Sequence, residues 1–155
     1  MKSLIVFYSR TGTTKTVAQK LAEKLNADLE EITDKDTRKG LFGFLRSGKQ
    51  GMKGLLTKIE PTQKDPAAYD LVVIGTPVWA GRLCSPVRTY LTQNAANCKK
   101  VAFFTTQGGN KEQKVFKDME ELCCREPLCK VFFRTAEVKK AEFETKLTDF
   151  VKSLS

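Results

Sequence analysis

Hydroxyl side chains crowd one short loop near the start of the chain. This loop comprises Ser9, Arg10, Thr11, Gly12, Thr13 and Thr14. Hydroxyls donate hydrogen bonds to anionic oxygens, and a helix beginning here would aim its unpaired amides and its positive dipole end at the same place. An ordinary N-cap with a polar turn is the alternative, but one cap needs fewer than four hydroxyls. We therefore predict a phosphate-binding loop.

The same loop excludes two common nucleotide motifs. It lacks the lysine of a Gly-x-x-x-x-Gly-Lys-Ser/Thr motif and the glycine spacing of a dinucleotide fingerprint, so neither ATP nor NAD is implied. It also contains no cysteine, which disfavours a cysteine-dependent phosphatase. The chain has no histidine at all, which disfavours a zinc or iron site and the usual general base. We expect no metal site and assign no catalytic residue.

Two further candidate binding loops follow apolar runs later in the chain. The second loop contains Thr76, Pro77, Val78, Trp79, Ala80 and Gly81. The third contains Thr105, Thr106, Gln107, Gly108, Gly109 and Asn110. Paired glycines let a backbone approach a flat ligand closely, although Gly-Gly-Asn before a helix is also a plain turn with a cap.

The apolar pattern predicts strands that alternate with helices. Continuous apolar runs suit buried strands, and they occupy residues 4–8, 71–75, 101–104 and 131–133. A more polar run at 29–32 suits a strand nearer an edge. Helical spacing of apolar residues predicts amphipathic helices that begin near residues 13–14, 86, 111 and 143.

This order of elements implies one α/β domain over residues 1–155. Parallel strands joined by right-handed crossovers place helices on both faces of a sheet, so we expect three layers and a doubly wound, five-stranded parallel sheet. In such sheets a ligand lies beyond the carboxyl ends of the strands, where the strand order reverses. The three polar loops each follow such an end, so they should meet at one edge.

The segment 39–59 is basic, amphipathic and interrupted by five glycines. We favour a crossover whose apolar side covers the sheet. The alternative is a docking surface for a partner or for a membrane surface.

The formal charge of the chain is +9, from 27 Lys and Arg against 18 Asp and Glu. The basic residues recur between apolar positions, as on solvated helix faces, so we expect no nucleic acid and instead a protein partner with an acidic docking surface. No apolar run reaches the length of a membrane span, and no export signal precedes the first strand. Five cysteines without Cys-x-x-Cys spacing then predict free thiols in a cytoplasmic protein.

The first two loops together resemble those of the flavodoxin family. Flavodoxins carry Thr/Ser-x-Thr-Gly-x-Thr after their first strand, and residues 9–14 are similar to it, with Thr13 where many members have asparagine. The second loop resembles the family's Gly-Thr-Pro-x-Trp-x-Gly pattern. The resemblance covers nearly the whole chain apart from 39–59, and the short stretch before the last helix is typical of short-chain members. It implies a flavodoxin-like fold with strand order 2-1-3-4-5 and FMN as the cofactor.

The resemblance also implies roles around the flavin ring. It places Trp79 beside the isoalloxazine, with a buried core tryptophan as the alternative, and makes the peptides around Ala80 and Gly81 those that could turn a carbonyl toward the flavin N5. Many flavodoxins have a tyrosine in the third loop; here there is none, so that ring face is covered by backbone or left open. Arg82 stands in a loop without a carboxylate, and we expect its charge to favour the reduced flavin.

Two functions from different classes fit this site. An electron-transfer protein between redox partners needs an exposed flavin edge and a charged docking face. An FMN-dependent reductase of quinones or similar small acceptors needs an open ring face and NAD(P)H as donor. We favour the carrier, because the chain is a minimal domain with no candidate acid or base near the three loops. A regulatory domain that kept the fold and lost the ligand is a third alternative.

Overall fold

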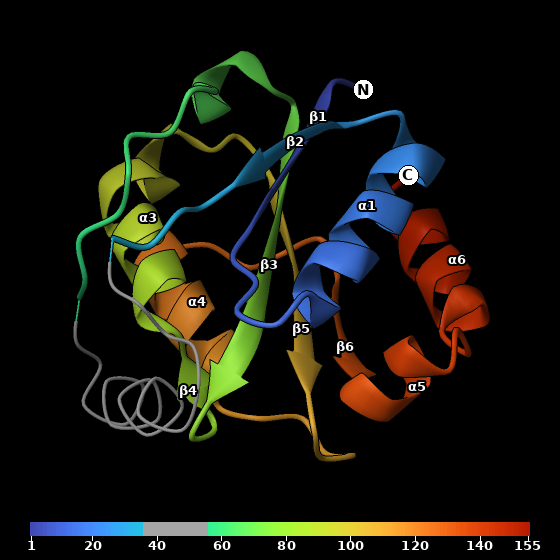
Figure 1. Cartoon of the computed structure of the whole chain (residues 1–155). Helices are drawn as coiled ribbons and strands as arrows, with labels where there is room; N and C mark the ends of the chain where they lie inside the picture. The colour runs from blue at the N-terminus through green and yellow to red at the C-terminus, as the bar shows by residue number, and fades with distance from the viewer. Residues whose placement is uncertain (36–55) are drawn as a thin grey trace.

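Five parallel strands form the middle layer of the molecule (Figure 1). The computed structural model describes residues 1–35 and 56–155, so the predicted crossover at 39–59 lies outside the described residues except for 56–59. The parallel strands are β1 (Ser3–Phe7), β2 (Asp28–Glu31), β3 (Leu71–Trp79), β5 (Val101–Gln107) and β6 (Lys130–Arg134). Their order is β2-β1-β3-β5-β6, and every neighbouring pair is parallel. Counting parallel strands alone, this is the predicted order 2-1-3-4-5, so the doubly wound fold is confirmed.

A short antiparallel strand adds to the predicted sheet. β4 (Arg82–Leu83) pairs with the end of β3, with Trp79 opposite Arg82. Ala80 and Gly81 connect the two strands with φ angles of 51° and 77°. Positive φ at both central residues is the turn whose twist suits a two-residue hairpin.

Two of the predicted loops are therefore partly strand. β3 was expected to end at Gly75 and β5 at Phe104, and both expectations were wrong. Thr76 and Pro77 continue the parallel ladder opposite Thr105 and Thr106. The polar residue types suggested a loop, but the pairing of neighbouring backbones keeps these residues extended.

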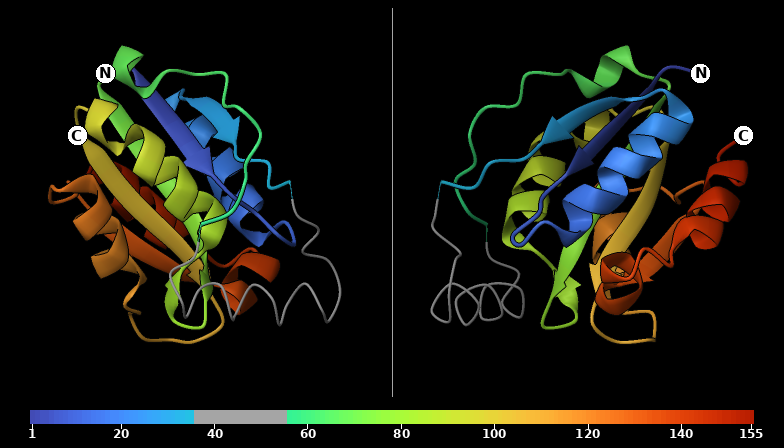
Figure 2. Two further views of the ribbon diagram at one scale, coloured as in Figure 1. Left: turned by 90° about the vertical axis from the view of Figure 1, so that its left-hand side faces the viewer. Right: turned by 45° about the vertical axis from the view of Figure 1, so that its right-hand side comes forward.

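Helices cover both faces of the sheet (Figures 1 and 2). One face carries α3 (Ser85–Asn94) and α4 (Val115–Cys123), and the other carries α1 (Thr13–Leu25), α5 (Thr135–Lys139) and α6 (Glu144–Lys152). Two short 3-10 helices, Pro66–Ala68 and Ala95–Asn97, lie in connections. The predicted starts of α1, α3 and α6 agree within one residue, α4 begins later than predicted, and α5 was not predicted.

The core consists of two apolar clusters, one on each face of the sheet. Alternate residues of the buried strands enter different clusters: Val6 packs with the α3 and α4 side, whereas Ile5 packs with the α1 and α6 side. Gly75 marks a close approach inside the second cluster, because a Cβ there would lie 2.1 Å from Cζ of Phe104. Only glycine leaves room for that ring.

No helix within the described residues is long and apolar enough to cross a membrane. The same part of the chain contains no group of three or more His, Cys, Asp or Glu side chains that could hold a metal ion. All five cysteines are free thiols, three of them buried.

Candidate functional site

The three polar loops meet at the carboxyl edge of the sheet, which is the lower edge in Figure 1. Parallel pairing sets Phe7 of β1 beside Gly75 of β3, and Thr76 of β3 beside Thr105 of β5. The loops that follow these strands therefore emerge side by side. This places the predicted site residues together, as the topology required.

The first loop is organised by Ser9 and Gly12. The Ser9 Oγ accepts hydrogen bonds from the backbone amides of Gly12 at 3.0 Å and Lys15 at 3.2 Å. Gly12 has φ of 101°, and an added Cβ would find no protein atom within 4 Å. The side chain of Ser9 thus fixes the turn from inside, while open space lies in front of Gly12.

The start of α1 presents unused hydrogen-bond donors beside that space. The amides of Thr13 and Thr14 have no partner within the described residues, and neither do the hydroxyls of Thr11 and Thr13. Such amides at a helix start form an anion site together with the helix dipole. Arg10, which is half-buried, supplies a positive charge in the same loop.

A buried hydroxyl pair joins the first and third loops. The Oγ1 atoms of Thr14 and Thr106 lie 2.7 Å apart, and both residues are buried. The pair carries two hydroxyl hydrogens and uses one of them in this contact. One donor therefore remains for a ligand, and the two loops hold each other in place.

The third loop is held from inside by Gln107. Its Nε2 donates to the carbonyl oxygens of Gly109 at 3.2 Å and Lys111 at 2.6 Å, and its Oε1 accepts from the Thr105 hydroxyl at 3.4 Å. The side chain of Gln107 thus faces the protein, and the exposed segment 108–110 offers its backbone to a ligand.

Two side chains of the second loop point into the core. The Thr76 hydroxyl, which is buried, donates to the Pro77 carbonyl at 2.8 Å and lies 3.1 Å from the Cys84 Sγ. Trp79 is 5% exposed, and its ring meets the ring of Tyr8 edge-on at 5.8 Å between centroids. The residues of this loop that reach the surface are Pro77, Val78, Ala80 and Gly81.

Gln113, to which no sequence pattern assigned a role, lies near both the second and the third loop. Its Oε1 is 3.3 Å from the position of a Cβ on Gly81, and its Nε2 is 3.7 Å from that on Gly109. A half-buried amide is thus available next to the turn at residues 80–81.

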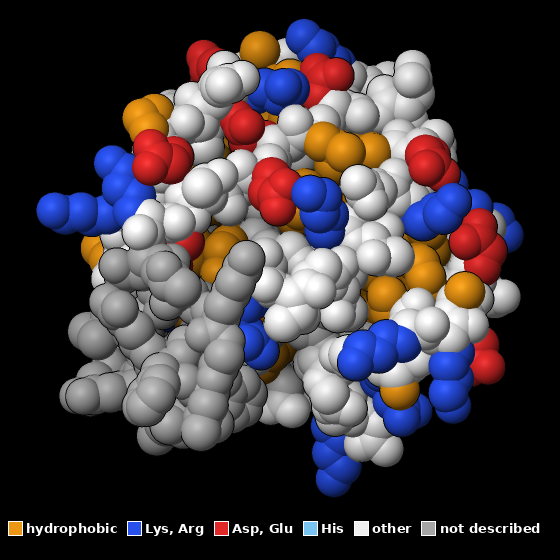
Figure 3. All heavy atoms as spheres, in the orientation of Figure 1, with side chains coloured by type: hydrophobic (Ala, Val, Ile, Leu, Met, Phe, Trp, Pro, Cys, Tyr) orange, Lys and Arg blue, Asp and Glu red, His pale blue; other side chains and the backbone are white. Residues whose placement is uncertain are grey.

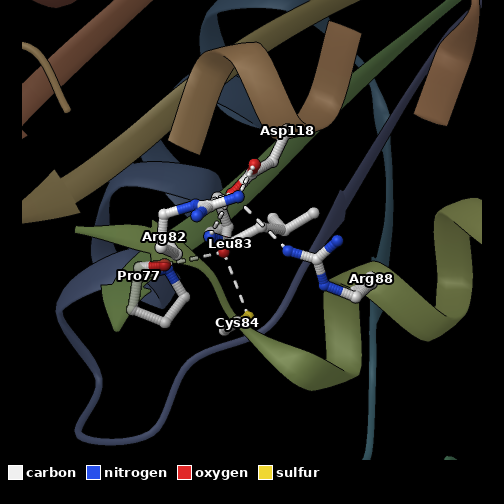
Figure 4. Close-up of polar contacts among 7 residues, drawn as sticks. Pro77, Arg82, Leu83, Cys84, Arg88 and Asp118 are labelled. Atoms are coloured by element: carbon white, nitrogen blue, oxygen red, sulfur yellow. Dashed lines mark hydrogen bonds and ion pairs between the residues drawn. The ribbon is translucent and has the colours of Figure 1, made fainter. Parts of the chain in front are cut away.

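Sequence reasoning also missed Asp118 of α4 (Figure 4). Its carboxylate accepts from Arg82 Nε at 2.9 Å and Nη2 at 2.7 Å, and from the Leu83 amide at 3.1 Å. Arg88 Nη2 lies at 3.5 Å. Burial raises the pKa of Asp118, but the hydrogen bonds from Arg82 and Leu83 and the charge of Arg88 outweigh it, so the pKa is below its usual value. The carboxylate is therefore ionised at neutral pH.

This ion pair corrects the expectation for Arg82. We expected its charge to stand in a loop without a carboxylate, but α4 brings one into bidentate contact. A signal was present in the sequence: Asp118 lies three residues after Val115 and four residues before Leu122, so it shares a helix face with these two apolar residues. A carboxylate within an apolar helix face predicts a buried cationic partner.

Comparisons with known proteins show which solved structures this chain resembles. A solved flavoprotein from Lactobacillus acidophilus NCFM, in complex with FMN, is 27% identical over 90% of this chain and 97% of its own, with a TM-score of 0.72. A protein from Bacteroides uniformis ATCC 8492 reaches a TM-score of 0.76 at 20% identity, covering 94% and 97%. An NADH:FMN oxidoreductase shares the fold at 12% identity, with a TM-score of 0.60 and coverage of 98% and 87%.

No curated protein matches the chain. A family model described as Flavodoxin matches residues 2–152, which is almost the entire length. The chain belongs to the flavodoxin family.

Proposed function

We propose that this protein binds FMN at the carboxyl edge of the sheet and passes electrons between redox partners in the cytoplasm. FMN is the cofactor of the flavodoxin family, and a similar flavoprotein was crystallised with it. When bound, FMN supplies the electron-transfer chemistry, while the protein sets its position and access. The observation that carries the proposal is the open space in front of Gly12, beside unpaired donors of α1.

The residues that border the open space in front of Gly12 provide the hydrogen-bond donors that a phosphate dianion needs. The free amides of Thr13 and Thr14 and the hydroxyls of Thr11 and Thr13 are donors, and the Thr14–Thr106 pair adds one more. No carboxylate belongs to the loop, so an anion meets no like charge there. The ring of FMN would then extend toward residues 77–81 and 108–110.

A basic rim beside the third loop supports an acidic redox partner. We use this name for Lys111, Lys114, Arg134 and Lys139. Arg134 pairs in register with Gln107, and the Thr135 hydroxyl donates to the Gln107 carbonyl at 3.2 Å, so the start of α5 adjoins the third loop. Figure 3 shows basic side chains gathered at the lower right, over this part of the molecule.

The carboxylates close to the basic rim are already paired. Glu112 lies 3.3 Å from the Lys130 ammonium, and Glu137 lies 2.6 Å from that of Lys146. The rim therefore keeps an excess of positive charge, which steers a negatively charged partner toward the site.

An FMN-dependent reductase of quinones or similar small acceptors is the second candidate. The exposure of Gly108, Gly109 and Asn110 favours it, because these residues offer no aromatic side chain to cover a ring face. Such an open face would accept a small substrate and a nicotinamide donor.

Absorption spectroscopy of the purified protein, followed by mass spectrometry of the released cofactor, tests FMN binding. We expect a yellow protein and the mass of FMN, and the apoprotein should take up one equivalent in calorimetry. A colourless protein that takes up no FMN would indicate a domain that kept the fold and lost the ligand. Steady-state turnover of NADH or NADPH with a quinone by the protein alone would instead establish the reductase.

A further inference from the structure

We infer that Asp118 is a positioning residue that holds the turn at Ala80 and Gly81 in place beside the flavin ring. The inference rests on the proposed function, since it concerns the same site. Asp118 itself lies behind the hairpin on α4 and acts through Arg82 and Leu83.

The shortest contacts of Asp118 fall on the two residues that immediately follow the turn, and a longer one, at 3.5 Å, joins it to Arg88. Both carboxylate oxygens bind the Arg82 guanidinium, at 2.7 and 2.9 Å, and one of them also accepts from the Leu83 amide at 3.1 Å. These two residues are the whole of β4. Figure 4 shows Arg82 of this short strand and Arg88 of α3 both directed toward the carboxylate. A single side chain therefore ties the entire returning strand to α4.

The turn needs such support from outside. β4 pairs with β3 through two residue pairs only, and short isolated hairpins are marginally stable. Ala80 has a φ of 51°, a left-handed conformation that residues other than glycine rarely adopt. Without an external anchor, neither the ladder nor the local backbone preference would keep this conformation.

The other end of the hairpin is anchored separately. The Cys84 Sγ lies 3.1 Å from the Thr76 hydroxyl, which joins the residue after β4 to β3. Asp118 and this contact therefore act on different residues, and removing the carboxylate should release Arg82 while Cys84 stays fixed. The expected result is local loosening around residues 80–83 within an intact fold.

Substitution of Asp118 tests the inference against a matched control. Asp118→Ala removes the two hydrogen bonds from Arg82, the one from the Leu83 amide and the longer one from Arg88. Asp118→Asn retains the volume and one acceptor as a milder second variant. Glu120→Gln is the control, because it makes the same charge change on the same helix, where Glu120 contacts Lys130 at 3.2 Å instead of the hairpin.

Amide hydrogen exchange, the Kd for FMN and the midpoint potentials are measured on the wild type and on each variant. Amide hydrogen exchange of the apoprotein should be about tenfold faster at Arg82 and Leu83 in Asp118→Ala, with Asp118→Asn between it and wild type. The Kd for FMN should rise about tenfold. The two midpoint potentials, measured at saturating FMN, should change more in Asp118→Asn than in Glu120→Gln.

Two outcomes would overturn the positioning role. One is unchanged exchange at Arg82 and Leu83 in the apoprotein of both Asp118 variants. The other is faster exchange together with an FMN Kd and potentials that match those of Glu120→Gln. Failure of the proposed function looks different, because the wild-type protein itself would then take up no FMN.

Discussion

Among the glycines in the described part of the chain, Gly12 and Gly108 are those at which an added methyl group would meet no atom within 4 Å beyond the adjacent residues. They differ in backbone conformation, because only Gly12 lies in the left-handed region, at φ 101°. A side chain at Gly12 therefore brings backbone strain of about 1 kcal/mol, whereas one at Gly108 brings none. The pair separates effects on the fold from effects on a ligand.

We predict that Gly12→Ala lowers the free energy of unfolding of the apoprotein by about 1 kcal/mol, and that Gly108→Ala changes it by less than about 0.5 kcal/mol. Both should weaken FMN binding, since each methyl group enters space assigned to the cofactor. Urea denaturation and flavin fluorescence quenching measure the two quantities. Unchanged FMN affinity in both variants would contradict the location of the site.

At the residue scale, the sequence predicted which loops are polar but not what each side chain does. Ser9, Thr14, Thr106 and Gln107 were all predicted to contact the cofactor, and that prediction stays untested. The structure shows that they also bond to the protein itself. The contact between Thr14 and Thr106 joins residues 92 positions apart, which residue types alone do not reveal.

Gly75 of β3 packs against Phe104 of β5, and this contact between neighbouring strands leads to a prediction about stability. A Cβ at residue 75 would lie 2.1 Å from Cζ of the Phe104 ring. This ring is fully buried and packs edge-on against Phe133, with 6.2 Å between centroids, so it cannot move aside freely. Gly75→Ala should therefore destabilise the apoprotein by about 3 kcal/mol in urea denaturation, the upper end for overpacking.

Replacing the aromatic ring of Phe104 with the smaller side chain of leucine provides the control for this clash. In the Phe104→Leu background, Gly75→Ala should cost much less than in the wild type, because the aromatic atoms that clash are gone. A double-mutant cycle measures the difference as a coupling energy. Equal costs in the two backgrounds would mean that the glycine is needed for some other reason.

Two buried or half-buried carboxylates join neighbouring elements and make stability depend on pH. Asp118 joins α4 to β4, and Glu137 joins α5 to α6 through Lys146 at 2.6 Å. Burial raises the pKa of Glu137, but hydrogen bonds from the Lys146 ammonium and the Arg134 amide outweigh it and lower the pKa. Each carboxylate thus has a lower pKa in the folded state than in the unfolded state.

A lowered carboxylate pKa contributes stability above the unfolded pKa, near 4, and that contribution is lost as the pH falls through the folded value. We predict that the free energy of unfolding of the wild type falls between about pH 5 and pH 3. The Asp118→Asn/Glu137→Gln variant should be less stable at pH 6 and lose less over the same interval. Parallel pH profiles for the two proteins would argue against this linkage.

The elements missed in the sequence are those too short to show a period. β4 has two residues, and α5 has five with Val138 alone buried, so neither repeats an apolar spacing. Pro77 concealed the continuation of β3, because proline usually stays out of central strands. The long buried strands were recognised because a continuous apolar run can be read from the sequence without knowing which strand it pairs with.

At the scale of the whole molecule, the sequence predicted the topology better than the charge distribution. Alternating strands and helices, together with right-handed crossovers, left few arrangements, and the one found has the expected order. The sequence showed the net charge of +9, but not where on the surface the positive charge is concentrated. Arg134 comes to lie beside Gln107 of the third loop only because β5 pairs with β6.

The basic rim leads to a prediction about electron transfer. Its charges lie at the carboxyl edge, so they should attract anionic oxidants and repel cationic ones over about a Debye length, near 8 Å at physiological salt. We predict that ferricyanide reoxidises the reduced protein more slowly as salt increases, and that hexaamminecobalt(III) does so faster. Replacing Lys111, Lys114 and Lys139 by glutamine should lower the ferricyanide rate several-fold at low salt.

A second triple variant separates the rim from the net charge. Lys2, Lys99 and Lys100 lie beside the amino ends of β1 and β5, at the opposite edge of the sheet, and their replacement by glutamine makes the same change in total charge. Since screening weakens distant charges most, this variant should keep nearly the wild-type rate at moderate salt. Equal effects of the two triple variants would mean that overall charge, and not the rim beside the third loop, governs access to the site.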